Sequence, residues 1–168
     1  MTIAKAAQAG KKPFVLRKGI STIQDLDIAP ISITSSTVTL NPVTHSGRLV
    51  VLNLAAGIAV TLPPATGSGD PYTVVVGTTF TGAATIKVTG NDVMKGTALL
   101  FADSGDTVVG FATAADSDTI SLFGTGNANG GIAGEIVELV DMAADTWLVR
   151  LVSDAGGTEA TPFSATVS

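Results

Sequence analysis

Two residue types that are often catalytic are scarce in this sequence, which has one histidine and no cysteine. His45 is the only histidine, and it lies in Asn41-Pro42-Val43-Thr44-His45-Ser46-Gly47-Arg48, which is typical of a turn before a strand. A Ser-His-Asp triad would need one hydroxyl selected by a motif, and no Gly-x-Ser-x-Gly string occurs. The nearest string, Thr66-Gly67-Ser68-Gly69-Asp70, has its glycines at another offset and indicates a turn.

The acidic residues could serve as metal ligands or as acid and base. The strings best suited to Ca²⁺, which prefers several hard oxygens, are Asp103-Ser104-Gly105-Asp106 and Asp116-Ser117-Asp118. Nothing at a recognisable offset supplies the other ligands, which favours solvated turn carboxylates. The carboxyl pairs that a glycosidase would need are Glu135 with Glu138, and Asp141 with Asp145. Sugar-binding grooves usually carry several aromatic residues, and this chain has one Trp, one Tyr and six Phe. We therefore predict no enzyme activity, no catalytic or metal-binding residue and no cofactor.

Two further features have an alternative chemical interpretation. The glycine-rich segment 124–131 suggests a phosphate loop, but it lacks the third glycine of Gly-x-Gly-x-x-Gly. The segment Glu135–Val140 that follows alternates like a strand, so a hairpin loop is favoured. Trp147, the only tryptophan, lies on an alternating stretch, where a core or subunit-interface anchor is favoured over a ligand platform.

The charge is divided unevenly along the chain. Five bases and no acid precede residue 19, namely Lys5, Lys11, Lys12, Arg17 and Lys18. The remainder has four bases against 14 acids, and 4 − 14 gives −10. A basic N-terminal arm thus precedes an acidic body. Because that body would repel a phosphate backbone, we expect the arm to bind protein and not nucleic acid, with a solubilising tail as the alternative.

Short β-branched runs separated by Gly, Pro, Asn and Asp predict an all-β fold. The candidate strands are Ile31–Leu40, Arg48–Asn53, Ala59–Leu62, Tyr72–Val76, Thr85–Val88, Thr107–Ala112, Thr119–Phe123, Glu135–Val140 and Trp147–Val152. The close spacing of turns favours antiparallel pairing, and the absence of a fixed-period repeat disfavours a parallel β-helix without excluding it. Ala4–Ala9 and, more weakly, Asp92–Leu100 are the possible short helices, although Gly96 opposes the second.

These observations predict an antiparallel β-sandwich or jelly-roll-like barrel with an extended N-terminal arm. Residues 1–40 would form the basic arm and a lead-in strand, and residues 41–168 the body. The chain has no cysteine, so the fold must rest on packing without disulfides. Neither a signal-peptide apolar run nor a membrane-spanning stretch is present, which predicts synthesis in the cytoplasm and no membrane contact.

Several strings resemble the small head-surface proteins of tailed bacteriophages, known as decoration or cement proteins. The strings are Val60-Thr61-Leu62-Pro63-Pro64-Ala65-Thr66-Gly67-Ser68-Gly69, Tyr72-Thr73-Val74-Val75-Val76-Gly77-Thr78-Thr79, Ala84-Thr85-Ile86-Lys87-Val88, Asp92-Val93-Met94-Lys95-Gly96, Trp147-Leu148-Val149 and Thr161-Pro162-Phe163-Ser164. They fall within residues 48 to 164 and are turn-and-strand patterns, not catalytic signatures. Residues 1 to 47 match no such pattern.

The resemblance implies a β-sandwich or jelly-roll body, often trimeric, that binds the outer surface of a capsid and stabilises it by bridging copies of the major capsid protein. It also implies location on the virion, with an N-terminal arm reaching over neighbouring capsid subunits. Related strings occur in phage fibres, so a receptor- or glycan-binding module of a tail fibre or other virion appendage is the alternative.

Overall fold

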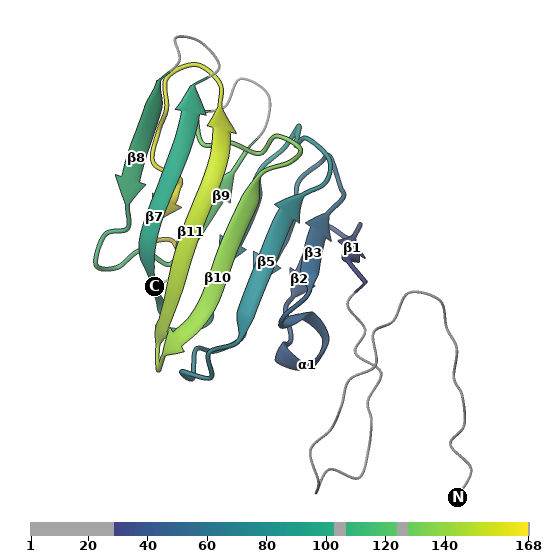
Figure 1. Ribbon diagram of the computed structural model, residues 1–168, viewed down its shortest axis with the longest axis vertical. Helices are drawn as coiled ribbons and strands as arrows, with labels where there is room; N and C mark the ends of the chain where they lie inside the picture. Colours follow the sequence, from purple (N-terminus) through teal and green to yellow (C-terminus); the bar gives the residue numbers. More distant parts are fainter. Residues whose placement is uncertain (1–28, 103–106, 124–127, 168) are drawn as a thin grey trace, which may run out of the picture.

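A computed structural model describes residues 29–102, 107–123 and 128–167. The described residues contain twelve strands, which form two sheets packed face to face, and one short helix (Figure 1). The strands are β1 (Ile31–Ile33), β2 (Thr37–Thr39), β3 (Leu49–Leu52), β4 (Ala59–Thr61), β5 (Pro71–Val76), β6 (Ala84–Lys87), β7 (Val93–Ala102), β8 (Val108–Ala112), β9 (Thr119–Leu122), β10 (Ile136–Ala143), β11 (Thr146–Ala155) and β12 (Phe163–Ser164). The helix α1 spans Pro42–His45. The all-β prediction is confirmed.

The larger sheet has seven strands in the order β1-β3-β5-β10-β11-β7-β8, and the smaller has five in the order β12-β9-β6-β4-β2. Both sheets are mixed, and each has two open edges, so the described strands form no closed barrel. The edges are β1 and β8 in the larger sheet and β12 and β2 in the smaller. We call the side of the larger sheet that faces away from the smaller one its outer face.

The first half of the chain winds between the two sheets. Strands β1, β3 and β5 belong to the larger sheet, and β2, β4 and β6 to the smaller. Within each sheet, these strands pair in parallel in chain order, β1 with β3 and β3 with β5, and β2 with β4 and β4 with β6. The prediction of antiparallel pairing is therefore wrong for these strands, which wind like a short β-helix. Successive windings of the chain around the two sheets differ in length. Ile31 pairs with Val50, which is 19 residues later in the sequence, and Val50 pairs with Val74, which is 24 residues later. This inequality explains why the sequence has no fixed period.

The second half supplies the longest pairings. Strands β5, β10 and β11 are antiparallel neighbours, and β7 lies parallel to β11 over ten residues (Figure 1). The weak helix prediction at Asp92–Leu100 is wrong, because β7 occupies this segment. Met94, Ala98 and Leu100 point inward and are buried, so pairing on both sides overrides the helix propensity of Met, Ala and Leu.

Two other expected elements differ in detail. The predicted strand Ile31–Leu40 divides into β1 and β2, because the chain turns at Ser35 and Ser36 from one sheet to the other. The Ser35 hydroxyl donates to the Thr37 carbonyl at 2.8 Å, which stabilises this turn. Strands β1 and β2 both pair with strands of the body. The possible helix Ala4–Ala9 lies outside the described residues.

The core lies between the sheets. Alternating residues of β5, β10 and β11 point inward, as the two-residue period of a strand requires. The largest fully buried side chains are Trp147, Tyr72, Phe80, Leu40, Leu52, Ile58, Leu62, Ile86, Met94, Leu100, Ile120 and Leu122. Both sheets contribute to this set, so packing between them provides most of the hydrophobic stabilisation.

Candidate functional site

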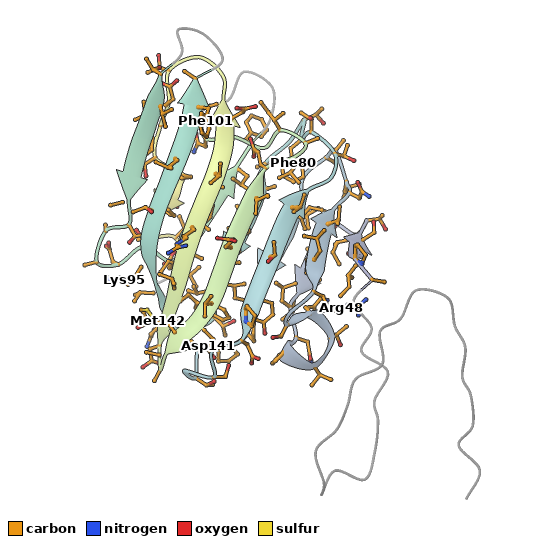
Figure 2. The ribbon with its side chains drawn as sticks, in the orientation of Figure 1. Arg48, Phe80, Lys95, Phe101, Asp141 and Met142 are labelled. Carbon is orange, nitrogen blue, oxygen red and sulfur yellow. The ribbon has the colours of Figure 1, made fainter. Side chains whose placement is uncertain are left out.

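Asp141, near the end of β10, accepts hydrogen bonds from three consecutive residues, Thr66 to Ser68. Its carboxylate accepts from the amides of Thr66, Gly67 and Ser68 at 2.6 to 3.2 Å, and from the hydroxyls of Thr66 and Ser68 at 2.9 Å. Desolvation raises its pKa, but these hydrogen bonds outweigh that effect and lower the pKa to about 2. Asp141 therefore fastens the loop between β4 and β5 to the end of the larger sheet (Figure 2).

Other acids also hold backbone segments. Asp118 accepts from the amides of Thr166 and Val167 at 2.7 and 2.9 Å, which ties the C-terminal segment to β9. Asp92 accepts from the amide of Ala65 at 2.7 Å. These side chains are buried, and their oxygens face amides of the same chain.

Glu135 has the same type of environment. Its carboxylate accepts from the amides of Gly131 and Asp154 at 2.6 and 3.1 Å. Burial nevertheless raises its pKa above the usual value, because desolvation outweighs the hydrogen bonds. The glutamate thus joins the segment before β10 to the end of β11.

The candidate catalytic groups are not brought together. His45 is buried at the end of α1, where its Nδ1 accepts from the Asn41 amide at 2.9 Å. Glu138 lies on the outer face and Glu135 is buried beneath the loop at residue 131. Within the described ranges, no three His, Asp or Glu side chains gather as metal ligands would. Asp103 and Asp106 lie outside those ranges, as do residues 124–127.

Trp147 lies in the core, only 1% exposed. Its ring meets that of Tyr72 edge to face, with ring centroids 5.6 Å apart. Neither the Tyr72 hydroxyl nor the indole Nε1 has a hydrogen-bond partner among the described residues. Burial, together with the negative charges of Asp70 and Asp141, raises the pKa of Tyr72 to about 12. The two rings lie at the end of the sandwich where Asp141, the strand partner of Trp147, holds the loop between β4 and β5.

The outer face of the larger sheet is apolar along one half. Five of its side chains are 42 to 52% exposed, and we call them the outer patch: Leu99, Phe101, Val108, Ile136 and Val152. They are contributed by β7, β8, β10 and β11, which are neighbours in the sheet. Figure 2 shows Phe101 at one end of β7, and Lys95 near the other. Such a concentration of large apolar side chains is typical of a surface that binds another protein.

The outer patch continues across the sheet as a single row. Ile136 pairs with Val152, Val152 with Leu99, and Leu99 with Gly110. In the other direction the row continues through Val75 of β5 and Val51 of β3, both partly exposed. Because the pairs are in register, their side chains lie on the same side of the sheet.

The other half of the outer face is more polar. Glu138 lies opposite Arg150, which lies beside Thr97 of β7. A shallow depression of about 250 Å³ crosses this region, and its lining includes Glu138, Arg150 and Thr73. Tyr72 contributes to the lining as well, but its buried ring points to the core. This depression offers a stacked sugar no aromatic platform among the residues that line it.

The five basic residues predicted to bind a partner, Lys5, Lys11, Lys12, Arg17 and Lys18, all lie outside the described residues. The sequence reasoning missed the outer patch. A signal was present in Leu99-Leu100-Phe101, where consecutive apolar residues must point to both faces of one strand.

In the described part of the chain, no helix is long and apolar enough to cross a membrane. Comparison with protein-family models, curated proteins and solved structures finds no match to this chain.

Proposed function

We propose that this chain is a structural virion protein that binds the outer surface of a phage capsid and stabilises the shell by bridging subunits of the major capsid protein. The observation that supports this most strongly is the outer patch, an exposed apolar surface on the larger sheet. The strings that resemble decoration proteins supply the class of partner. Under this proposal the chain acts as a homo-oligomer without enzymatic activity.

The uneven charge supports a second contact. Residues 1–28 have five bases and two acids, a net charge of +3, and residues 29–168 have four bases and 12 acids, a net charge of −8. The basic arm that the sequence predicts is suited to an acidic strip on a neighbouring capsid subunit. Two contacts on different subunits would produce bridging, because each raises the effective concentration of the other. The jelly-roll form of the body, which the resemblance implies, is not needed for this.

The test is sedimentation of the purified chain with capsids that lack it. Leu99→Gln with Val152→Gln makes the outer patch polar and should weaken binding at least tenfold, since truncating or polarising anchors at an interface costs more than about 1 kcal/mol. Thr97→Gln is the matched control, because Thr97 lies two residues from Leu99 on the same face of β7. It should bind like the wild type.

The arm is tested separately. Lys11→Glu with Lys12→Glu should weaken binding and reduce its dependence on salt, because ionic contacts are screened at high ionic strength. Failure of the wild-type chain to sediment with capsids at saturating concentration contradicts the proposal. Binding to bacterial surface glycans in its place would favour the alternative, a receptor-binding module of a tail fibre.

A further inference from the structure

In the part of the chain that the structure describes, β8 is an unpaired edge of the larger sheet and lacks the usual protection. Natural sheets protect their edges with very short strands, charged side chains, proline or a covering segment. Strand β8 is five residues long, and its sequence Val-Val-Gly-Phe-Ala contains no charge and no proline. Figure 1 shows it at the margin of the sheet, beyond β7.

The other three edges in the described part of the chain are protected. Strands β1 and β2 have three residues each, and β12 has two. Pro30 precedes β1, and the Arg48 guanidinium donates to the carbonyl of Ala29 beside it. Pro162 precedes β12. Among the described edge strands, only β8 combines length with an unprotected backbone.

The hydrogen-bond pattern defines which groups of β8 face outward. Its neighbouring residues bond to β7, since the Ala102 amide donates to Thr107 at 3.0 Å and the Thr113 amide donates to Gly96 at 3.1 Å. Antiparallel pairs alternate between bonded and non-bonded, so Val109 and Phe111 bond to β7 as well. The amides and carbonyls of Val108, Gly110 and Ala112 therefore point away from the sheet.

We infer that β8 pairs with β8 of a second copy of this chain, antiparallel about a twofold axis at Gly110. In that register Gly110 lies opposite its own equivalent, and Val108 lies opposite Ala112 of the other copy. Three pairs with two bonds each give six hydrogen bonds, which use all the outward-facing groups of both strands. Half-buried Phe111 would lie beside Val109 of the other copy, on the inner side of the sheet.

A twofold contact suits this edge better than a threefold one. A ring of three would need β8 to meet a different edge of the next copy, because cyclic trimers use two unlike surfaces. The other edge of the larger sheet is β1, which is too short to bond to all five residues of β8. At this edge we therefore favour a dimer over the trimer that the resemblance implies.

Dimerisation would also double the outer patch. The twofold axis passes through Gly110, which is part of the apolar row with Leu99, Val152 and Ile136. Both outer faces then lie on the same side of one fourteen-stranded sheet. The row would extend over 12 strands, or 11 strand spacings of about 4.8 Å, which is roughly 50 Å. If the proposed function holds, the dimer presents two equivalent patches to one capsid surface.

The first experiment is cross-linking, and it uses the purified chain without capsids, so it is independent of the proposed function. The chain has no cysteine, which means that an introduced one can bond only to its equivalent. Gly110→Cys should form a covalent dimer on mild oxidation, because bonded antiparallel pairs have Cα atoms about 5.5 Å apart. A Cβ at this position meets only Leu99, at 3.8 Å, so the variant should fold.

Ala112→Cys is the matched control on the same strand and face. Its equivalent in the dimer lies four residues away along the strand, about 14 Å, which is too far for a disulfide. Val43→Cys, at a residue that is 95% exposed on α1, measures random collision. We expect at least tenfold more covalent dimer from Gly110→Cys than from either control. Equal yields from the three variants would overturn the inference.

The second experiment measures the mass of the unmodified chain by light scattering. The dimer has twice 16.8 kDa, or 33.6 kDa. Gly110→Pro removes the central outward amide without touching the β7 ladder and should halve this mass, whereas Gly110→Ala should leave it unchanged. A wild-type mass of one or three chains contradicts the twofold pairing. If Gly110→Pro fails to fold, as circular dichroism would show, the wild-type mass and the cross-linking decide.

Discussion

Asp141 provides the sharpest test of how the loop between β4 and β5 is held. The change is Asp141→Asn, which keeps the size of the side chain but removes the charge. It also turns an NH₂ group toward the amides of Thr66, Gly67 and Ser68, which need acceptors. The variant should therefore be less stable than the wild type, because it loses the part of these hydrogen bonds that depends on the negative charge.

The magnitude follows from the pKa of Asp141, which falls from 3.8 to about 2. At 1.36 kcal/mol per pH unit this fall corresponds to roughly 2 kcal/mol. The carboxylate lies at the end of the sandwich near solvent, and screening reduces the charge-dependent part to about 1 to 2 kcal/mol. Adding an unpaired donor costs about 1 kcal/mol more, so we expect a loss of about 2 to 3 kcal/mol at pH 7.

The lowered pKa also predicts how the stabilisation by Asp141 changes with pH. The folded protein has the lower pKa, so the stabilisation is complete above about pH 4 and is lost as pH falls through about 2. Urea unfolding at pH 7, 4 and 2.5 should show the gap between wild type and Asp141→Asn narrowing as pH falls. Glu138→Gln, on the outer face of the same strand, is the control and should change stability by less than about 0.5 kcal/mol. A gap at pH 7 no larger than this control, or one that does not change with pH, would refute the reasoning.

Three other substitutions test the core, with Gly110→Ala on the edge strand β8 as a control. Trp147→Ala should lower the free energy of unfolding by about 3 to 5 kcal/mol in urea denaturation, because it empties a buried site next to Tyr72; a loss below 1 kcal/mol would contradict the packing. Gly96→Ala should destabilise the protein in thermal melts, whereas Gly110→Ala should not, because a Cβ at Gly96 would overlap the carbonyl of Val149. Tyr72→Phe should cost less than about 0.5 kcal/mol at pH 7, because the hydroxyl has no partner among the described residues. Absorbance titration of the single tyrosine should show ionisation near pH 12 in the folded state. The free energy of unfolding should fall above pH 10, because the tyrosine of the unfolded chain ionises first. A titration midpoint near 10 in the folded state would show that Tyr72 is exposed.

The strands were predictable where alternation and turns act locally. Tyr72-Thr73-Val74-Val75-Val76 indicates β5 through its β-branched residues alone, and the predicted strand Ala59–Leu62 contains β4. The parallel winding was not predictable in the same way, because it depends on which strands meet and not on the strands themselves. Turns of unequal length leave no period in the sequence for that pairing.

The acids and the outer patch show the same limit. The sequence indicates a solvated or metal-binding carboxylate at Asp118 and a candidate catalytic carboxyl at Asp141. Both instead hold amides that are distant in the sequence, 48 residues away for Asp118 and 75 for Asp141. Their roles arise from tertiary contacts that spacing cannot report. The outer patch likewise requires knowledge that β10, β11 and β7 are neighbours, since Ile136, Val152 and Leu99 come from separate segments.

The central claim is that the chain binds the capsid shell through the outer face of its larger sheet. Averaged electron microscopy of capsids reconstituted with the purified chain tests it most directly. We predict ordered density on the outer shell, with the outer faces of β7, β10 and β11 turned toward capsid subunits, and loss of that density in the double variant Leu99→Gln, Val152→Gln. Density confined to the tail, or shell density that is unchanged in the double variant, would contradict it.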